Sequence, residues 1–310
     1  MTARHISVII STRNRPRDVE RCLVSLSRVM YARWDITLID QSDDKRTHDA
    51  VEKLTDILPP LMYRHSSEKG LSRARNEGMN VSQGDIFAFL DDDCTVEPTW
   101  LEDVAGLFDR YPHAAIAFGA VEASAHDQQT TFISAYTPRK ERVLRGQWSS
   151  FRVTGMGASM YLRRAIAQRV GSFDVCLGAG SSLFKSTEET DYAYRTLALG
   201  KEIVETPMVQ VHHYGARDFQ SGAFAQLIRD HAYASGALDM KVLRCRGAAG
   251  LILLVVHSCA YLMKVDVRNL VLGRRPNRLA WIVMYVRGLG AGRRLGVDRQ
   301  RCLFVDTLEG

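Results

Sequence analysis

The sequence predicts an α/β fold in which helices cover both faces of a mostly parallel sheet. Short β-rich runs alternate with helical patterns through the first half of the 310-residue chain, an order typical of parallel sheets. Residues 86–90 (IFAFL) are apolar at every position, as expected of a strand that is buried on both faces. With 46% hydrophobic and 25% charged residues, the composition excludes the disordered, collagen-like and disulfide-scaffold classes.

The expected elements follow from local patterns, in chain order. Short apolar runs that end in polar turns predict strands at residues 6–10, 36–39, 61–63, 86–90 and 114–123. Apolar side chains at helical spacing predict helices over residues 17–30, 50–58, 71–81 and 188–199. A loop with a strand is expected at residues 151–162, and an extended segment that ends in two histidines at residues 203–214.

The chain is expected to divide near residue 215, into an α/β body (residues 1–215) and a basic, mainly helical C-terminal region (residues 216–310). Residues 239–301 hold thirteen Lys or Arg against three Asp, a charge of +10 in a chain whose net charge is +6. This excess indicates an anionic partner such as a membrane surface, and the alternative is a solvated helical face. Since the region lacks a nucleic-acid-binding motif, we expect no nucleic acid partner.

Neither export nor insertion into a membrane is expected. The apolar run at residues 6–10 is too short for a signal peptide. The longest apolar stretch, residues 250–263, contains His257 and falls short of the ~20 residues that span a bilayer. Six cysteines without a Cys-x-x-Cys pair fit reduced thiols rather than a zinc knuckle or a redox motif. We therefore expect a cytoplasmic protein.

Polar side chains follow three of the predicted strands, at residues 11–15, 40–44 and 91–93. Ligands of parallel sheets bind outside the carboxyl ends of the strands, so these groups are expected to line one crevice. The three consecutive carboxylates at 91–93 would raise one another's pKa unless a cation neutralised them. Mn²⁺ or Mg²⁺ would do so through oxygen ligands. The alternative is a solvated acidic turn that caps the next helix.

Two other clusters could carry chemistry. Glu188, Glu189 and Asp191 stand at the start of a predicted helix, behind Thr187 as an N-cap. The helix dipole favours acidic residues there, but one of the carboxylates could instead serve as a general base. The pair His212–His213 could complete a metal site begun by the aspartates, and the alternative is a structural role.

Seven segments, in the family's order, resemble the inverting glycosyltransferases of family 2, which have the GT-A fold. They extend over about the whole α/β body and are SVIISTRNRPRDVERCLVSL (7–26), ITLIDQSDD (36–44), GLSRARNEG (70–78), GDIFAFLDDDCTVEPTWL (84–101), GMGASMYLRR (155–164), GSFDVCLGAGS (171–181) and STEETDYAYR (186–195). The resemblance implies a nucleotide-sugar donor, a UDP-, TDP- or GDP-sugar, held at the strand ends with Mn²⁺ or Mg²⁺.

The resemblance also assigns roles to residues. Asp93, with Asp91, matches the metal-binding Asp-x-Asp signature, and His212 or His213 matches a late histidine that some members use as a metal or diphosphate ligand. Asp40 matches the carboxylate that recognises the base, although the sequence there is IDQS where many relatives have a second acidic residue. The positions that match donor-binding residues are Thr12, Arg13, Arg15, Asp40, Arg73, Asp91, Asp92 and Gly155.

In the family, an acidic pair ahead of a helical Asp and Arg contains the catalytic base. That pattern maps onto Glu188 and Glu189, followed by Asp191 and Arg195. We take Glu189 as the expected base and hold Glu188 and Asp191 in reserve. The implied reaction is a single in-line displacement that inverts the anomeric carbon, with the metal stabilising the leaving diphosphate.

The implied acceptor is a hydroxyl of a glycan or of a polyprenyl-linked molecule, in the assembly of bacterial surface polysaccharide or glycoconjugates. The basic C-terminal helices could then dock on the inner face of the plasma membrane, or pack against the body or a second subunit. The alternative functions are a non-catalytic scaffold that binds a sugar nucleotide and a metal-dependent nucleotidyltransferase, which would release pyrophosphate.

Overall fold

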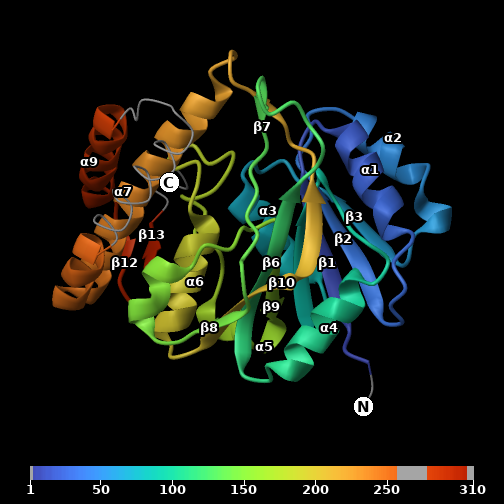
Figure 1. Ribbon diagram of the computed structural model, residues 1–310, viewed down its shortest axis with the longest axis horizontal. Helices are drawn as coiled ribbons and strands as arrows, with labels where there is room; N and C mark the ends of the chain where they lie inside the picture. Colours follow the sequence, from blue (N-terminus) through green and yellow to red (C-terminus); the bar gives the residue numbers. More distant parts are fainter. Residues whose placement is uncertain (1–2, 257–277, 306–310) are drawn as a thin grey trace.

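The computed structural model describes residues 3–256 and 278–305. In these ranges the chain forms a nine-stranded sheet between layers of helices, with a helical C-terminal region beside it (Figure 1). This architecture confirms the predicted α/β body. The strands, in their order across the sheet, are β3 (Leu61–His65), β2 (Trp34–Asp40), β1 (Ile6–Thr12), β4 (Ile86–Asp91), β9 (Ser159–Arg163), β6 (Ala114–Ala123), β10 (Glu202–His213) and β5 (Cys94–Thr95), and β8 (Arg142–Leu144) also pairs with β10.

The sheet is mixed rather than mostly parallel. β1, β2, β3 and β4 pair in parallel, as do β6 and β10. Between these two groups β9 runs antiparallel to both β4 and β6. A parallel neighbour needs a crossover of a dozen or more residues, usually a helix. The strand–helix alternation stops after α4 (Trp100–Arg110). Between β6 and β9, a stretch that is described throughout, the chain forms a 3₁₀ helix, η2 (Gln147–Arg152), and no α-helix that could serve as such a crossover.

Both faces of the sheet are buried, as the apolar run at residues 86–90 predicts. Along β4, Ile86, Ala88 and Leu90 belong to a core that also contains side chains of α1, α2 and α4. Phe87 and Phe89 belong to a second core on the opposite face, with side chains of α3, α5 and α6. The helices named here are α1 (Pro16–Leu26), α2 (Arg46–Glu52), α3 (Leu71–Val81), α5 (Arg164–Val170) and α6 (Glu188–Ala198).

Most predicted elements are present, and the main error has a local cause. α3 and β6 have the predicted bounds. The helix predicted over residues 50–58 is wrong, because α2 begins earlier and ends at Glu52, and a 3₁₀ turn follows at Thr55–Ile57. Pro59 keeps the residue before it in an extended conformation, which stops the helix from continuing.

The C-terminal region is helical, as predicted, and glycines hold its helices together. Its described elements include α7 (Ala223–Arg246), α9 (Arg278–Arg294) and a hairpin of β12 (Val297–Asp298) and β13 (Leu303–Phe304). A Cβ on Gly236 of α7 would lie 2.1 Å from the carbonyl oxygen of Tyr285, and one on Gly288 of α9 would lie 2.0 Å from that of Tyr233. Because no side chain fits there, glycine at these positions is what lets the two backbones meet.

A buried lysine fastens this region to the α/β body. Lys241 of α7 lies 2.6 Å from Asp174 and 2.6 Å from Asp191 of α6. Asp191 also pairs with Arg195 at 2.9 Å. All three charged groups around Lys241 are buried, so the pairs fix α7 on α6 directly beside the start of that helix.

None of the helices in residues 3–256 and 278–305 is long and apolar enough to cross a membrane. The apolar stretch predicted at 250–263 lies only partly within these ranges. Residues 248–256 are helical, with Leu253 buried and Leu251, Ile252 and Val255 exposed, and the remainder, with Cys259, lies outside the described residues. The cysteines within the described ranges are free thiols.

Candidate active site

The carboxyl ends of β1 and β4 lie side by side because the two strands pair in parallel. The Thr12 hydroxyl donates a hydrogen bond to Asp92 at 2.7 Å. The guanidinium group of Arg15 donates to Asp92 and to Asp93, at 3.0 Å each. The polar groups that the sequence predicts to line one crevice at the strand ends are therefore in contact with one another, as a cluster of hydroxyl, cationic and carboxylate groups.

The aspartates of this crevice differ in acidity. Burial raises the pKa of Asp92 to about 7, which the positive charge of Arg15 and the Thr12 hydrogen bond only partly oppose. Burial acts in the same direction on Asp93, but the hydrogen bond and charge of His213, with the charge of Arg15, outweigh it and hold the pKa of Asp93 below its ordinary value. Asp93 thus stays ionised, the state that a metal ligand requires.

The two histidines at the end of β10 face different groups. His213 is buried, with Nε2 3.2 Å from Asp93 and Nδ1 2.7 Å from the carbonyl oxygen of Ser134. The carbonyl accepts a hydrogen bond from the Nδ1–H group, which leaves Nε2 directed at Asp93. His212 lies 3.5 Å from Glu97 and 3.9 Å from Glu122. The structure therefore brings His213, and not His212, to the aspartates.

Asp93, Cys94 and His213 place ligand atoms within 4.8 Å of one another. Burial and the neighbouring carboxylates raise the pKa of Cys94 well above its usual value, so the thiol keeps its proton and is a poor ligand. A carboxylate oxygen and an imidazole nitrogen remain, a donor set that suits Mn²⁺. Gly215 keeps this space open, because a Cβ there would lie 2.5 Å from Asp93 and 2.7 Å from His213.

Three other predicted donor contacts lie around the crevice. Asp40 is buried, accepts a hydrogen bond from the Tyr63 hydroxyl at 2.6 Å, and accepts another from the Ser42 N–H at 2.8 Å. Each oxygen of Asp40 accepts one of these bonds and can accept another, so a base contact through Asp40 does not require either bond to break. Arg13 pairs with Asp43 at 3.3 Å and Arg73 with Glu68 at 3.1 Å, both nearer the surface.

An arginine that the sequence analysis missed connects the crevice to α6. Arg75 is 2% exposed, and it lies 3.1 Å from Glu188 and 3.3 Å from Asp91. Gly157 makes room for it, because a Cβ there would lie 2.6 Å from the guanidinium. The signal was available, since position 75 falls on the same helical face as the buried Ser72 and Gly78.

The three carboxylates at the start of α6 have separate roles. Glu188 is buried and paired with Arg75. Asp191 is fully buried between Lys241 and Arg195, a position that does not favour it as the base. Glu189 lines an open pocket. Burial and the negative charge of Glu188 raise the pKa of Glu189 to about 8.

Backbone strain directly precedes these carboxylates. Thr187 has a φ of 73°, which is rare for a β-branched residue. Its hydroxyl donates to the carbonyl oxygen of Ser186 and makes no capping hydrogen bond to the helix. Thr187 thus occupies the predicted N-cap position, but without the side-chain hydrogen bond that an N-cap threonine usually makes. Strained backbone of this kind concentrates at functional sites.

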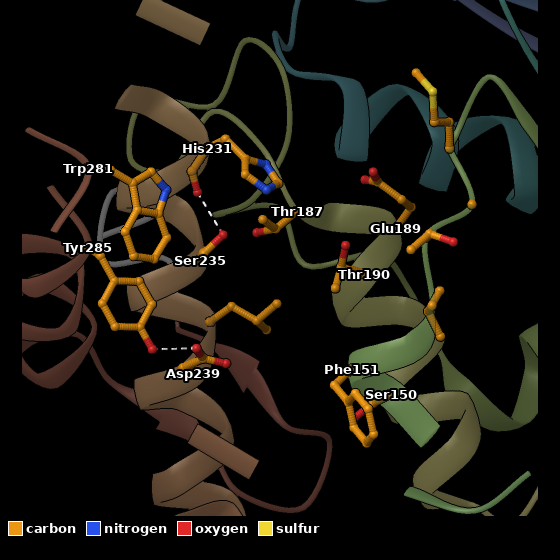
Figure 2. Close-up of a pocket in the computed structure, with 15 residues that line it drawn as sticks. Ser150, Phe151, Thr187, Glu189, Thr190, His231, Ser235, Asp239, Trp281 and Tyr285 are labelled. Atoms are coloured by element: carbon orange, nitrogen blue, oxygen red, sulfur yellow. Dashed lines mark hydrogen bonds between the residues drawn. The ribbon is translucent and has the colours of Figure 1, made fainter. Parts of the chain in front are cut away.

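The pocket beside Glu189 has a volume of about 340 Å³ and lies between η2, α6, α7 and α9 (Figure 2). Gly155 lines it too, and its N–H donates to Glu205 at 3.0 Å. The C-terminal region contributes six of the fifteen lining residues, which no sequence motif had indicated: His231, Ser235, Leu238, Asp239, Trp281 and Tyr285.

Comparison with known proteins relates this chain to glycosyltransferases. Residues 7–170 match the profile described as Glycosyl transferase family 2. The succinoglycan biosynthesis protein ExoM of Rhizobium meliloti is 28% identical over 221 residues, which are 67% of this chain and 66% of that relative, just under two thirds of its length. A glucosyl-dolichyl phosphate glucuronosyltransferase of Haloferax volcanii is 20% identical over 215 residues, 67% of this chain and 68% of the relative.

Solved structures with the same fold include those of S. aureus TarS. The structure of TarS 1–349 superposes with a TM-score of 0.62 at 15% identity, over 93% of this chain and 80% of the other. The complex of TarS 1–349 with UDP-GlcNAc superposes with a TM-score of 0.61 at 15% identity, over 93% of this chain and 81% of the other. At this identity the likeness establishes the GT-A fold.

Proposed function

Since the chain belongs to glycosyl transferase family 2 and is an enzyme of glycosyl transfer, we propose that it moves a sugar from a nucleotide-sugar donor to an acceptor hydroxyl, with inversion and with a divalent metal. One observation carries the proposal. The crevice at the strand ends and the pocket beside Glu189 are joined through Arg75, which contacts Asp91 on one side and Glu188 on the other. A diphosphate at the first site and an acceptor at the second would meet there.

The donor is proposed to bind at the ends of β1, β2 and β4. Thr12 and Arg15 already contact the aspartates, and Arg13 and Arg73 stand nearer the surface as cations for the nucleotide or diphosphate. Because TarS structures hold UDP and UDP-GlcNAc, a UDP-sugar is the first donor to test, before TDP- and GDP-sugars.

Asp93 and His213 are the residues that would hold Mn²⁺ or Mg²⁺. The ion supplies Lewis-acid stabilisation of the charge that develops on the leaving diphosphate. Arg15 would add positive charge beside the ion and help to stabilise the diphosphate, since its guanidinium contacts Asp92 and Asp93. Asp92, with a pKa raised to about 7 by burial, can donate or accept a hydrogen bond with a sugar or ribose hydroxyl near neutral pH.

Glu189 is the proposed general base. It takes the proton of the acceptor hydroxyl while the acceptor oxygen forms a bond to the anomeric carbon and the bond from that carbon to the diphosphate breaks. The electron pair of the broken bond leaves with the nucleoside diphosphate. Its raised pKa makes Glu189 a stronger base than an ordinary carboxylate, as an acceptor alcohol demands. Arg75 holds Glu188 in place beside it.

The acceptor is proposed to be a glycan or polyprenyl-linked molecule of surface polysaccharide assembly, at the cytoplasmic face of the membrane. The relatives named for succinoglycan biosynthesis and for a dolichyl phosphate substrate support this class. Exposed Leu251, Ile252 and Val255 and the arginines of the C-terminal region provide apolar and cationic groups for a membrane surface. Sedimentation with phosphatidylglycerol vesicles, against phosphatidylcholine vesicles as control, tests this docking.

The test of the catalytic proposal measures nucleoside diphosphate release from UDP-, TDP- and GDP-sugars, with and without Mn²⁺. Metal-dependent release from one donor, lost in Asp93→Ala, is the expected result. Release of pyrophosphate instead would indicate a nucleotidyltransferase. If no nucleotide binds in a thermal-shift assay and none is released, the proposed function is wrong.

A further inference from the structure

The pocket beside Glu189 has an aromatic wall. Trp281 and Tyr285, one turn apart on α9, stack with ring centroids 5.0 Å apart and planes inclined by 18°. The Tyr285 hydroxyl donates a hydrogen bond to Asp239 of α7 at 2.6 Å. Figure 2 shows the two rings on the side of the pocket away from Glu189. The pocket therefore has a carboxylate on one side and a pair of aromatic side chains on the other.

The aromatic wall is rigid and preorganised. Trp281 is 5% exposed and Tyr285 is 7% exposed, so each ring is held by its neighbours. Gly236 fixes the position of α9, because a Cβ there would lie 2.1 Å from the Tyr285 carbonyl oxygen. Lys241 fixes α7 on α6. A ligand that binds here does not need to order these side chains, which lowers the entropic cost of binding.

The lining suits a neutral, polyhydroxylated ligand. No Lys or Arg is among the described residues that line the pocket, so a phosphate or diphosphate has no cation to bind there. Besides Glu189, the polar side chains of the lining include Asp239, Thr190, Ser235 and His231, and His231 stays neutral because burial lowers its pKa. Aromatic side chains with a few well-placed polar groups are typical of small-molecule sites.

We propose that this pocket binds one neutral pyranose ring of the acceptor, which packs against the stacked pair of Trp281 and Tyr285 and bonds a rim hydroxyl to Asp239. A pyranose presents a face of C–H groups, which pack on an aromatic ring, and a rim of hydroxyl groups, which need hydrogen-bond partners. The opposite wall then places an acceptor hydroxyl within reach of Glu189. The inference rests on the proposed function, and it makes the C-terminal region the part of the chain that selects the acceptor.

The carboxylate of Asp239 adds a prediction about charge. It repels a second carboxylate in a buried pocket, so a uronic acid binds less well than the neutral sugar of the same configuration. An acceptor whose terminal residue is glucuronic acid is therefore disfavoured.

The experiment is saturation-transfer difference NMR with methyl glycosides of glucose, galactose, mannose and N-acetylglucosamine, in the presence of UDP and Mn²⁺. The expected result is binding of at least one neutral glycoside, with saturation strongest on the ring C–H protons of one face. Methyl glucuronide is expected to bind less. Trp281→Leu should weaken binding about tenfold, while Trp281→Phe, which keeps a ring, should retain most of it.

Controls separate this inference from the proposed function. Ile282→Ala changes an exposed neighbour on the same helix and should leave glycoside binding unchanged. Tyr285→Phe is the second test variant if Trp281→Leu is unstable, because it keeps the ring and removes the hydrogen bond to Asp239. If no glycoside binds, or if wild type, Trp281→Leu and Asp239→Asn bind it equally, the inference of an acceptor pocket is wrong even where UDP binds. Failure of UDP binding instead overturns the proposed function.

Discussion

Replacing Lys241 by methionine should loosen the attachment of the C-terminal region to the α/β body. The change removes a cation that lies 2.6 Å from each of two buried carboxylates, Asp174 and Asp191, and keeps the apolar stem of the side chain. Removing one partner of a buried ion pair typically costs about 3–5 kcal/mol. Asp191 keeps Arg195, and Asp174 keeps two backbone N–H donors. We therefore expect the lower end of that range, about 3 kcal/mol.

Urea unfolding, followed by circular dichroism and fluorescence, measures this loss. Lys185→Met is the matched control, because Lys185 is exposed, and the same chemical change there should alter the free energy of unfolding by less than about 0.5 kcal/mol. Adding Asp174→Asn to Lys241→Met should cost less than the two single changes together, since the uncompensated charge is then gone.

A small effect would refute this reasoning. If Lys241→Met unfolds within about 1 kcal/mol of wild type, the ion pairs do not hold α7 on α6. The aromatic wall would then owe its position to the helix–helix contacts alone. A loss of stability together with unchanged UDP binding would agree with the role of Lys241 as a positioning residue outside the donor crevice.

Four further outcomes test the site. Glu189→Gln should keep UDP binding and slow transfer by about 10²–10⁴-fold, and near-normal transfer would exclude Glu189 as the base. Because the base must be ionised and the pKa of Glu189 is raised to about 8, kcat/KM should rise with pH and level off above that value, whereas a flat profile from pH 6 to 9 would contradict this. His213→Ala should weaken Mn²⁺ binding in calorimetry by more than about tenfold, and His212→Ala should not; equal effects would refute the assignment. Gly288→Ala should lower Tm, because its Cβ would lie 2.0 Å from a carbonyl oxygen, whereas Gly290→Ala, with nothing within 4 Å, should leave Tm unchanged or raise it; equal shifts would mean that the contact can relax.

Much of the donor crevice could be predicted from sequence. Parallel strands place their carboxyl ends along one edge, so the polar residues after β1 and β4 had to meet. The pairing of Thr12 and Arg15 with the aspartates follows from that geometry. The choice between His212 and His213 did not follow, because neighbouring strand residues point to opposite faces and the sequence does not say which face of β10 meets Asp93.

The roles of the α6 carboxylates depended on partners far away in the chain. Asp191 is a structural ion-pair partner because Lys241, fifty residues later, is buried against it. Glu188 forms an ion pair with Arg75, which lies more than a hundred residues earlier in the chain. Local pattern describes the helix that carries these carboxylates, but their acidity and access to a ligand are set by contacts that only the folded chain makes.

The sequence by itself determined the α/β body, the two buried faces of its sheet and the family, because hydrophobic periodicity and ordered motifs are local properties of the chain. Tertiary structure alone decided three features: the antiparallel pairing of β9 between β4 and β6, the direction in which each histidine and carboxylate points, and the pocket between α6, α7 and α9. That pocket exists because glycines let two helices approach and a buried lysine docks them on the body. These contacts join residues that are far apart in the chain, so no short stretch of sequence predicts them.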